Sequence, residues 1–89
     1  MKKVQVIYSG RVQAVGFRFT AVHLAKEFSV TGWVRNLPNG DVEVVAEADN
    51  KALTQFLNSL EDRMSGYIQA KDISWSESKN EFSAFDIRY

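Results

Sequence analysis

The segment best equipped for chemistry is a loop of mostly small or apolar residues that ends in an arginine. It reads GRVQAVGFR, from Gly10 to Arg18, between a β-branched segment and a segment with helical spacing of apolar residues. The first turn of a helix leaves backbone N–H groups without partners, and the helix dipole adds partial positive charge. Gly16 permits unusual backbone angles, and the guanidinium of Arg18 matches phosphate oxygens as a planar fork. The pattern indicates a phosphate cradle; the alternative is an ordinary strand-to-helix turn with an incidental surface arginine.

Other chemistry has little support in the sequence. The loop lacks the Gly-Lys-Ser/Thr of the nucleotide-binding P-loop and the glycine spacing of the dinucleotide fingerprint. With no cysteine and only one histidine, His23, the chain has almost nothing with which to build a transition-metal site, so we expect no metal and no cofactor. His23 lies away from the apolar helix stripe and is interpreted as solvent-exposed. Asp41, Glu43 and Glu47 are expected in solvent, on the outer face of a strand, rather than around a cation.

The composition limits the class of protein. A chain of 89 residues with 45% hydrophobic and 25% charged residues is typical of one globular domain, which we expect to span 1–89 and to leave no room for another. Eleven basic and eleven acidic residues balance, whereas nucleic-acid binding favours a basic excess. No apolar run approaches the roughly 18 residues that cross a bilayer, and the N-terminus does not resemble a signal peptide. The lack of cysteine fits a reducing compartment. We expect a cytoplasmic monomer without nucleic-acid or membrane partners.

The elements that must hold the loop follow from the periodicity of apolar residues. Alternation over 3–9 predicts a strand before the loop. After the loop, one face of a helix over 17–28 carries Phe17, Ala21, Leu24 and Phe28. Phe19 lies off this stripe, and the sequence leaves open whether it packs against the sheet edge or the loop.

The middle of the chain predicts a hairpin. Residues 29–36 form a β-branched and aromatic run, and residues 41–48 place valines and alanines on alternate positions. Between them, Leu37–Gly40 reads LPNG, in which proline presets φ and Asn-Gly tolerates positive φ. Two strands with so short a connection are expected to pair antiparallel.

A second helix and two further strands complete the pattern. The helix is predicted over 48–62, with Asp49 or Asn50 as its N-cap. Its buried face is predicted to carry Ala52, Leu53, Phe56, Leu57 and Leu60. A strand over 68–78 follows, with a bulge or bend near Asp72 where its alternation slips, and a last strand runs over 85–89.

The order β-α-β-β-α-β with a C-terminal strand predicts an α+β fold. Each helix has one apolar stripe, so both must cover one face of an antiparallel-dominated mixed sheet. Right-handed crossovers then give the ferredoxin-like split βαβ sandwich. The RNA-recognition fold shares this topology, and Trp33 and Trp75 could stack on bases. The strand over 41–48, however, lacks the aromatic and basic residues of that fold, which disfavours RNA.

Two segments resemble the signature motifs of the acylphosphatase family. GRVQAVGFR, from Gly10 to Arg18, resembles the first motif, and GWVRNLPNGDVEVVAEA, from Gly32 to Ala48, resembles the second. With the matching order of elements, the resemblance covers essentially the whole chain. It implies hydrolysis of the carboxyl-phosphate bond of a small acyl phosphate, giving a carboxylate and inorganic phosphate.

The resemblance also implies roles for particular residues. Arg18 would bind the phosphoryl group, and Asn36 would position the attacking water. Backbone amides of the intervening loop would hold the phosphate oxygens; these belong to Gln13, Ala14, Val15, Gly16 and Phe17. A carboxylate leaving group, whose acid has a pKa of about 4, departs without a general acid, so this sparse equipment is sufficient.

Two alanines depart from the family pattern. Ala14 and Ala48 stand where the family usually has glycine. If Ala14 takes a left-handed conformation, the strain is roughly 1–2 kcal/mol, although its backbone N–H is retained. We expect activity to survive, because Arg18 and Asn36 are both present. The alternative is a non-catalytic or weakly active anion-binding or regulatory module that keeps the fold.

Overall fold

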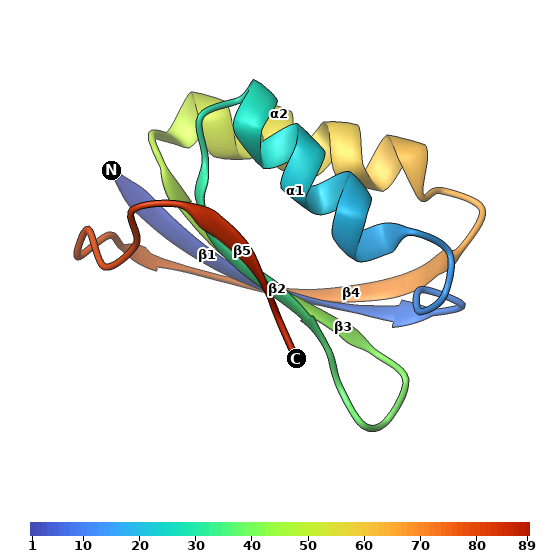
Figure 1. The fold of residues 1–89 in the computed structure, drawn as a ribbon. Helices are drawn as coiled ribbons and strands as arrows, with labels where there is room; N and C mark the ends of the chain where they lie inside the picture. The colour runs from blue at the N-terminus through green and yellow to red at the C-terminus, as the bar shows by residue number, and fades with distance from the viewer.

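The computed structural model describes residues 1–89 as five strands and two helices (Figure 1). In chain order they are β1 (Lys2–Gly10), α1 (Phe17–Glu27), β2 (Thr31–Asn36), β3 (Val42–Ala48), α2 (Asn50–Arg63), β4 (Ile68–Glu77) and β5 (Phe85–Arg88). The predicted order of elements is confirmed. Neither helix is long and apolar enough to cross a membrane.

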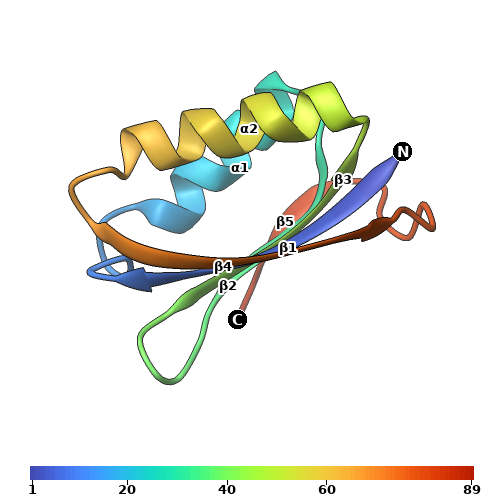
Figure 2. The same cartoon turned by 180° about the vertical axis from the view of Figure 1, so that it is seen from behind.

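The strands form one mixed sheet in the order β4-β1-β3-β2-β5. β1 runs antiparallel to β3 and β4, and β2 runs antiparallel to β3 but parallel to β5. Both helices cover the same face of the sheet, as two opposite views show (Figures 1 and 2). The ferredoxin-like fold predicted from the two apolar stripes is therefore confirmed.

The core between helices and sheet holds the start of α1 in place. Twenty buried apolar residues form one cluster, which includes the predicted stripe of α2 except Ala52, which is half-buried. Phe17, the first residue of α1, is 2% exposed, and its ring lies 5.4 Å from the ring of Tyr8 in β1. Because Phe17 is buried, the loop that precedes it has a fixed end.

Asp49 rather than Asn50 caps α2, accepting a hydrogen bond of 2.7 Å from the backbone N–H of Ala52.

The bulge in β4 lies at Gln69, and the prediction of a bulge near Asp72 was wrong. Ser9 pairs with Ala70 and Gly10 with Ile68, so one residue of β4 is left over between them. Gly10 has a positive φ of 123°, and a side chain there would collide with the carbonyl oxygen of Tyr67. The alternation of apolar and polar residues slips near Asp72 because β4 is an edge strand that is mostly exposed on both faces, so neither face has to be apolar.

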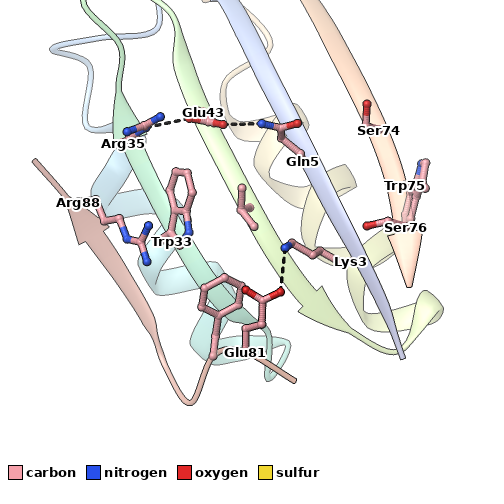
Figure 3. Close-up of a pocket in the computed structure, with 12 residues that line it drawn as sticks. Lys3, Gln5, Trp33, Arg35, Glu43, Ser74, Trp75, Ser76, Glu81 and Arg88 are labelled. Atoms are coloured by element: carbon pink, nitrogen blue, oxygen red, sulfur yellow. Dashed lines mark hydrogen bonds and ion pairs between the residues drawn. The ribbon is translucent and has the colours of Figure 1, made fainter. Parts of the chain in front are cut away.

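Glu43 and Glu47 are buried, so the prediction that they lie in solvent was wrong. Glu43 is 6% exposed and accepts hydrogen bonds from Arg35 and Gln5 on the strands beside it (Figure 3). Glu47 is 1% exposed and accepts from the Ser78 hydroxyl at 2.6 Å. The β4–β5 connection, which follows β4 in the chain, covers Glu47. His23, by contrast, is exposed as predicted.

Glu47 is expected to make folding stability depend on pH. Burial alone would raise the pKa of this carboxyl. Hydrogen bonds from the Ser78 hydroxyl and from the backbone N–H groups of Lys79 and Glu81 stabilise the charged form. Their effect outweighs that of burial and holds the pKa of Glu47 below its usual value. A carboxyl whose pKa is lower in the folded state stabilises the fold above its unfolded pKa of about 4.3 and loses this contribution as pH falls through the folded value. We expect Glu47→Gln to lower Tm by about 5 °C near pH 7 and to reduce the acid-induced fall in Tm.

Thermal unfolding of both proteins from about pH 7 down to about pH 3 tests this expectation. Glu27→Gln is the matched control, because Glu27 is exposed at the end of α1. Parallel Tm profiles for Glu47→Gln and the parent would show that the buried carboxylate has no such effect.

Candidate active site

A small cavity lies where the β1–α1 loop meets the end of β2. Its volume is about 230 Å³. Its lining consists of Val12, Ala14, Gly16, Phe17, Arg18, Phe19 and Asn36. Arg18 belongs to the first turn of α1, and Asn36 is the last residue of β2. We call this cavity the loop basin; it brings together the arginine and the asparagine that the sequence singled out from two separate segments.

The loop presents a series of free backbone donors. Ala14 has φ of 61° and Gly16 has φ of 77°, so two left-handed residues alternate with others in the loop. No backbone or side-chain acceptor of the protein is hydrogen-bonded to the N–H groups of residues 13–17, and no side chain caps α1. Successive N–H groups in such a conformation form a concave anion-binding nest, and the helix dipole adds to its positive potential.

Ala14 takes the left-handed conformation, with φ of 61°, for which the sequence analysis expected strain. An alanine there carries strain of roughly 1–2 kcal/mol, whereas glycine carries almost none but loses more entropy on folding. We expect Ala14→Gly to raise the free energy of unfolding by about 0.5–1 kcal/mol, measured by urea unfolding. Ala70→Gly in exposed β4 is the control and should destabilise by a similar amount. A loss of stability in Ala14→Gly would contradict the strain.

Arg18 supplies an uncompensated positive charge at the basin. Its side chain takes part in none of the salt bridges of the structure. Its guanidinium carbon lies 5.2 Å from the ring centroid of Tyr89, a cation–π contact with the exposed C-terminal residue. An aromatic ring does not neutralise the guanidinium, so the charge remains available to an anion.

Asn36 carries the one buried side-chain oxygen of the structure that lacks a hydrogen-bond partner. This atom is Oδ1, and the residue lines the loop basin. Buried polar atoms are normally paired with protein or with ordered water, because leaving them unpaired costs free energy. The basin has room for water, which occupies about 30 Å³ per molecule in the liquid. The Asn36 side chain therefore lines the basin and carries an amide oxygen that no group of the protein satisfies.

Gln13 has a side-chain contact that the sequence analysis missed. Its Nε2 donates to the backbone oxygens of Leu37 at 2.8 Å and Asp41 at 2.9 Å. These two bonds tie the β1–α1 loop to the β2–β3 turn, directly after Asn36. No pattern in the sequence marks this contact, because it joins two loops that only the fold brings together.

The remaining predicted loop residues divide between the basin and its support. Ala14, Gly16 and Phe17 line the basin. Val15 is not part of the lining and packs against the hydrophobic core. Val12 and Phe19 line the basin although the sequence analysis did not assign them to the site.

Tyr8 supports Phe17 from beneath and stays neutral. Burial, followed by the negative charge of Glu61, raises the pKa of the Tyr8 phenol well above its usual value. The Tyr8 hydroxyl donates to Glu61 at 2.9 Å, and Lys71 also donates to Glu61 at 2.9 Å. This network secures the layer below the loop and takes no part in the basin itself.

The fold and the basin together define a ferredoxin-like domain with a loop of free backbone N–H groups beside an arginine. The acylphosphatase family model matches residues 4–87. The acylphosphatase of Methanospirillum hungatei JF-1 is 40% identical over 89 residues, covering 99% of this chain and 98% of that protein. The crystal structure of acylphosphatase from Bacillus subtilis superposes with a TM-score of 0.91 at 30% identity, covering all of both chains. The chain belongs to the acylphosphatase family, a family of hydrolases.

The same fold also occurs within a much longer protein. The crystal structure of HypF from T. kodakarensis matches with a TM-score of 0.84 at 25% identity, and the match covers all of this chain but 12% of that one.

Proposed function

We propose that the protein hydrolyses the carboxyl-phosphate bond of acyl phosphates, with Arg18 and the loop holding the phosphoryl group and Asn36 orienting the attacking water. Membership of the acylphosphatase family supports the reaction. One observation carries the mechanism: the loop basin brings the guanidinium of Arg18, which forms no salt bridge, together with Asn36, whose Oδ1 has no partner within the protein. Ala14, Gly16 and Phe17 of the loop line the same basin, and their backbone N–H groups are free.

The loop and Arg18 supply electrostatic stabilisation. In phosphoryl transfer, negative charge spreads over the three equatorial oxygens of the transferred group, and catalysis consists mainly of placement and charge stabilisation. Backbone N–H donors that are already oriented do not reorganise during the reaction, so they stabilise this charge efficiently. The fork of Arg18 can donate two parallel hydrogen bonds to the same group.

Asn36 acts by orientation, because a carboxamide is too weak a base to remove a proton. Its Oδ1 accepts a hydrogen bond from water, whose oxygen then attacks phosphorus opposite the acyl oxygen. The P–O bond to the acyl group breaks and its electron pair leaves with the carboxylate. The protons of the water remain on the phosphate or pass to solvent. No general acid is needed, because the carboxylic acid corresponding to the leaving group has a pKa of about 4.

Hydrolysis of benzoyl phosphate by the purified protein, with and without EDTA, tests the proposal. We expect turnover that EDTA leaves unchanged, because the basin supplies its positive charge from Arg18 and backbone N–H groups.

The second candidate is a weakly active regulatory module, favoured by the strained Ala14 in the loop. Equally slow rates for the parent, Arg18→Ala and Asn36→Ala would establish that alternative. The expectation of a cytoplasmic monomer, which rests on the sequence, is part of the same proposal.

A further inference from the structure

A second cavity runs beside the loop basin, along the groove between α1 and β5. Its volume is about 650 Å³ and most of its lining residues are apolar. Val22 of α1 and Ile87 of β5 are among them, with Val30 and Phe85 deeper in the fold. We call this cavity the α1–β5 groove.

Phe19 joins the groove to the basin. It is the one residue that lines both cavities, and the two other cavities of the structure share no lining residue with the basin. Phe19 is 69% exposed, so neither the sheet edge nor the loop covers it. This resolves the choice that the sequence left open. An exposed phenylalanine next to Arg18 leaves apolar surface free at the edge of the basin, available to a ligand held by that arginine.

The chemistry of an acyl phosphate fits this arrangement. With the phosphoryl group in the basin, the acyl group must extend out of it, and the adjoining groove offers an apolar path past Phe19. The charged groups along the groove are Lys26 and Asp86, which have opposite signs and give no preference for an anionic tail. The groove therefore matches an apolar chain or ring better than a second phosphate or carboxylate.

The cavity on the open face of the sheet offers no such path. It has a volume of about 510 Å³. The residues that line it lie on the face of the sheet opposite the helices (Figure 3). Two of its cations are already paired, Lys3 with Glu81 and Arg35 with Glu43.

We propose that the α1–β5 groove binds the acyl substituent, so that the enzyme prefers acyl phosphates with apolar acyl groups and Phe19 determines this specificity. The inference rests on the proposed function. Each fully buried methylene contributes a factor of about three to four in affinity. A methylene in an open groove is only partly buried and contributes a smaller factor. Lengthening the acyl chain from acetyl to hexanoyl is therefore expected to raise kcat/KM by on the order of 10-fold or more.

The experiment compares kcat/KM for acetyl, butanoyl and hexanoyl phosphate, and its readout is the hexanoyl-to-acetyl ratio. We expect Phe19→Ser to lower this ratio at least about threefold and Phe19→Leu to restore most of it. Since Phe19 is largely exposed, both variants should fold. Trp75→Ser is the matched control, because Trp75 is also an exposed aromatic residue but lines only other cavities.

The possible outcomes separate the two proposals. If the parent enzyme hydrolyses acetyl phosphate but its hexanoyl-to-acetyl ratio is near one, the proposal that the groove binds the acyl substituent is wrong. The proposed function is then unaffected. An unchanged ratio in Phe19→Ser, or an equal fall in Trp75→Ser, would overturn the role of Phe19. A parent that hydrolyses none of the three compounds would remove the proposed function and the groove together.

Discussion

Arg18→Ala is expected to lower kcat/KM for benzoyl phosphate by about 10³-fold or more and to weaken the binding of inorganic phosphate. Arg18 is the only arginine that lines the loop basin, and no carboxylate neutralises it. Its removal takes away the only positively charged side chain of the basin and leaves neutral N–H donors for the equatorial oxygens. Both ground-state and transition-state binding should therefore weaken, so KM should rise while kcat falls.

Steady-state kinetics and calorimetric titration with phosphate would measure these changes. Arg18→Lys should recover only part of the activity, because an ammonium group provides charge without the planar fork. Arg63→Ala removes the same charge from the exposed end of α2 and should leave activity unchanged. Phosphate affinity in Arg18→Ala equal to that of the parent would refute the assigned role.

Asn36→Ala is expected to lower the catalytic rate while leaving the binding of inorganic phosphate almost unchanged. We expect kcat to fall by about 10²–10³-fold while the affinity for inorganic phosphate stays within about threefold of the parent. The reason is that Asn36 acts on the water, whereas the loop and Arg18 hold the phosphoryl group. Because Oδ1 lacks a partner within the protein, its loss removes no internal hydrogen bond, and the fold should lose little stability.

Two further variants sharpen this result. Asn36→Asp places a negative charge in the basin and should weaken phosphate binding by repulsion, which alanine does not. Asn58→Ala, on the exposed face of α2, is the control for removing a carboxamide. If Asn36→Ala loses phosphate affinity and rate in equal proportion, the asparagine holds the phosphoryl group and does not orient water.

The sequence alone determined the elements and their stacking. The apolar spacing of Phe17, Ala21 and Leu24 identified the buried face of α1, and the LPNG turn identified the β2–β3 hairpin. These patterns are local, since a helix or strand repeats at a fixed period and a turn requires particular residues. The two signature segments also pointed to Arg18 and Asn36.

The tertiary structure decided which groups are covered and which distant groups meet. Glu43 and Glu47 alternate with apolar residues as solvent-exposed side chains would, yet neighbouring strands and the β4–β5 connection bury them. The contact of Gln13 with the β2–β3 turn and the position of Phe19 between two cavities likewise depend on segments far apart in the chain. Periodicity reports which way a side chain points from its own element. What lies on that side is set by the packing of the whole chain.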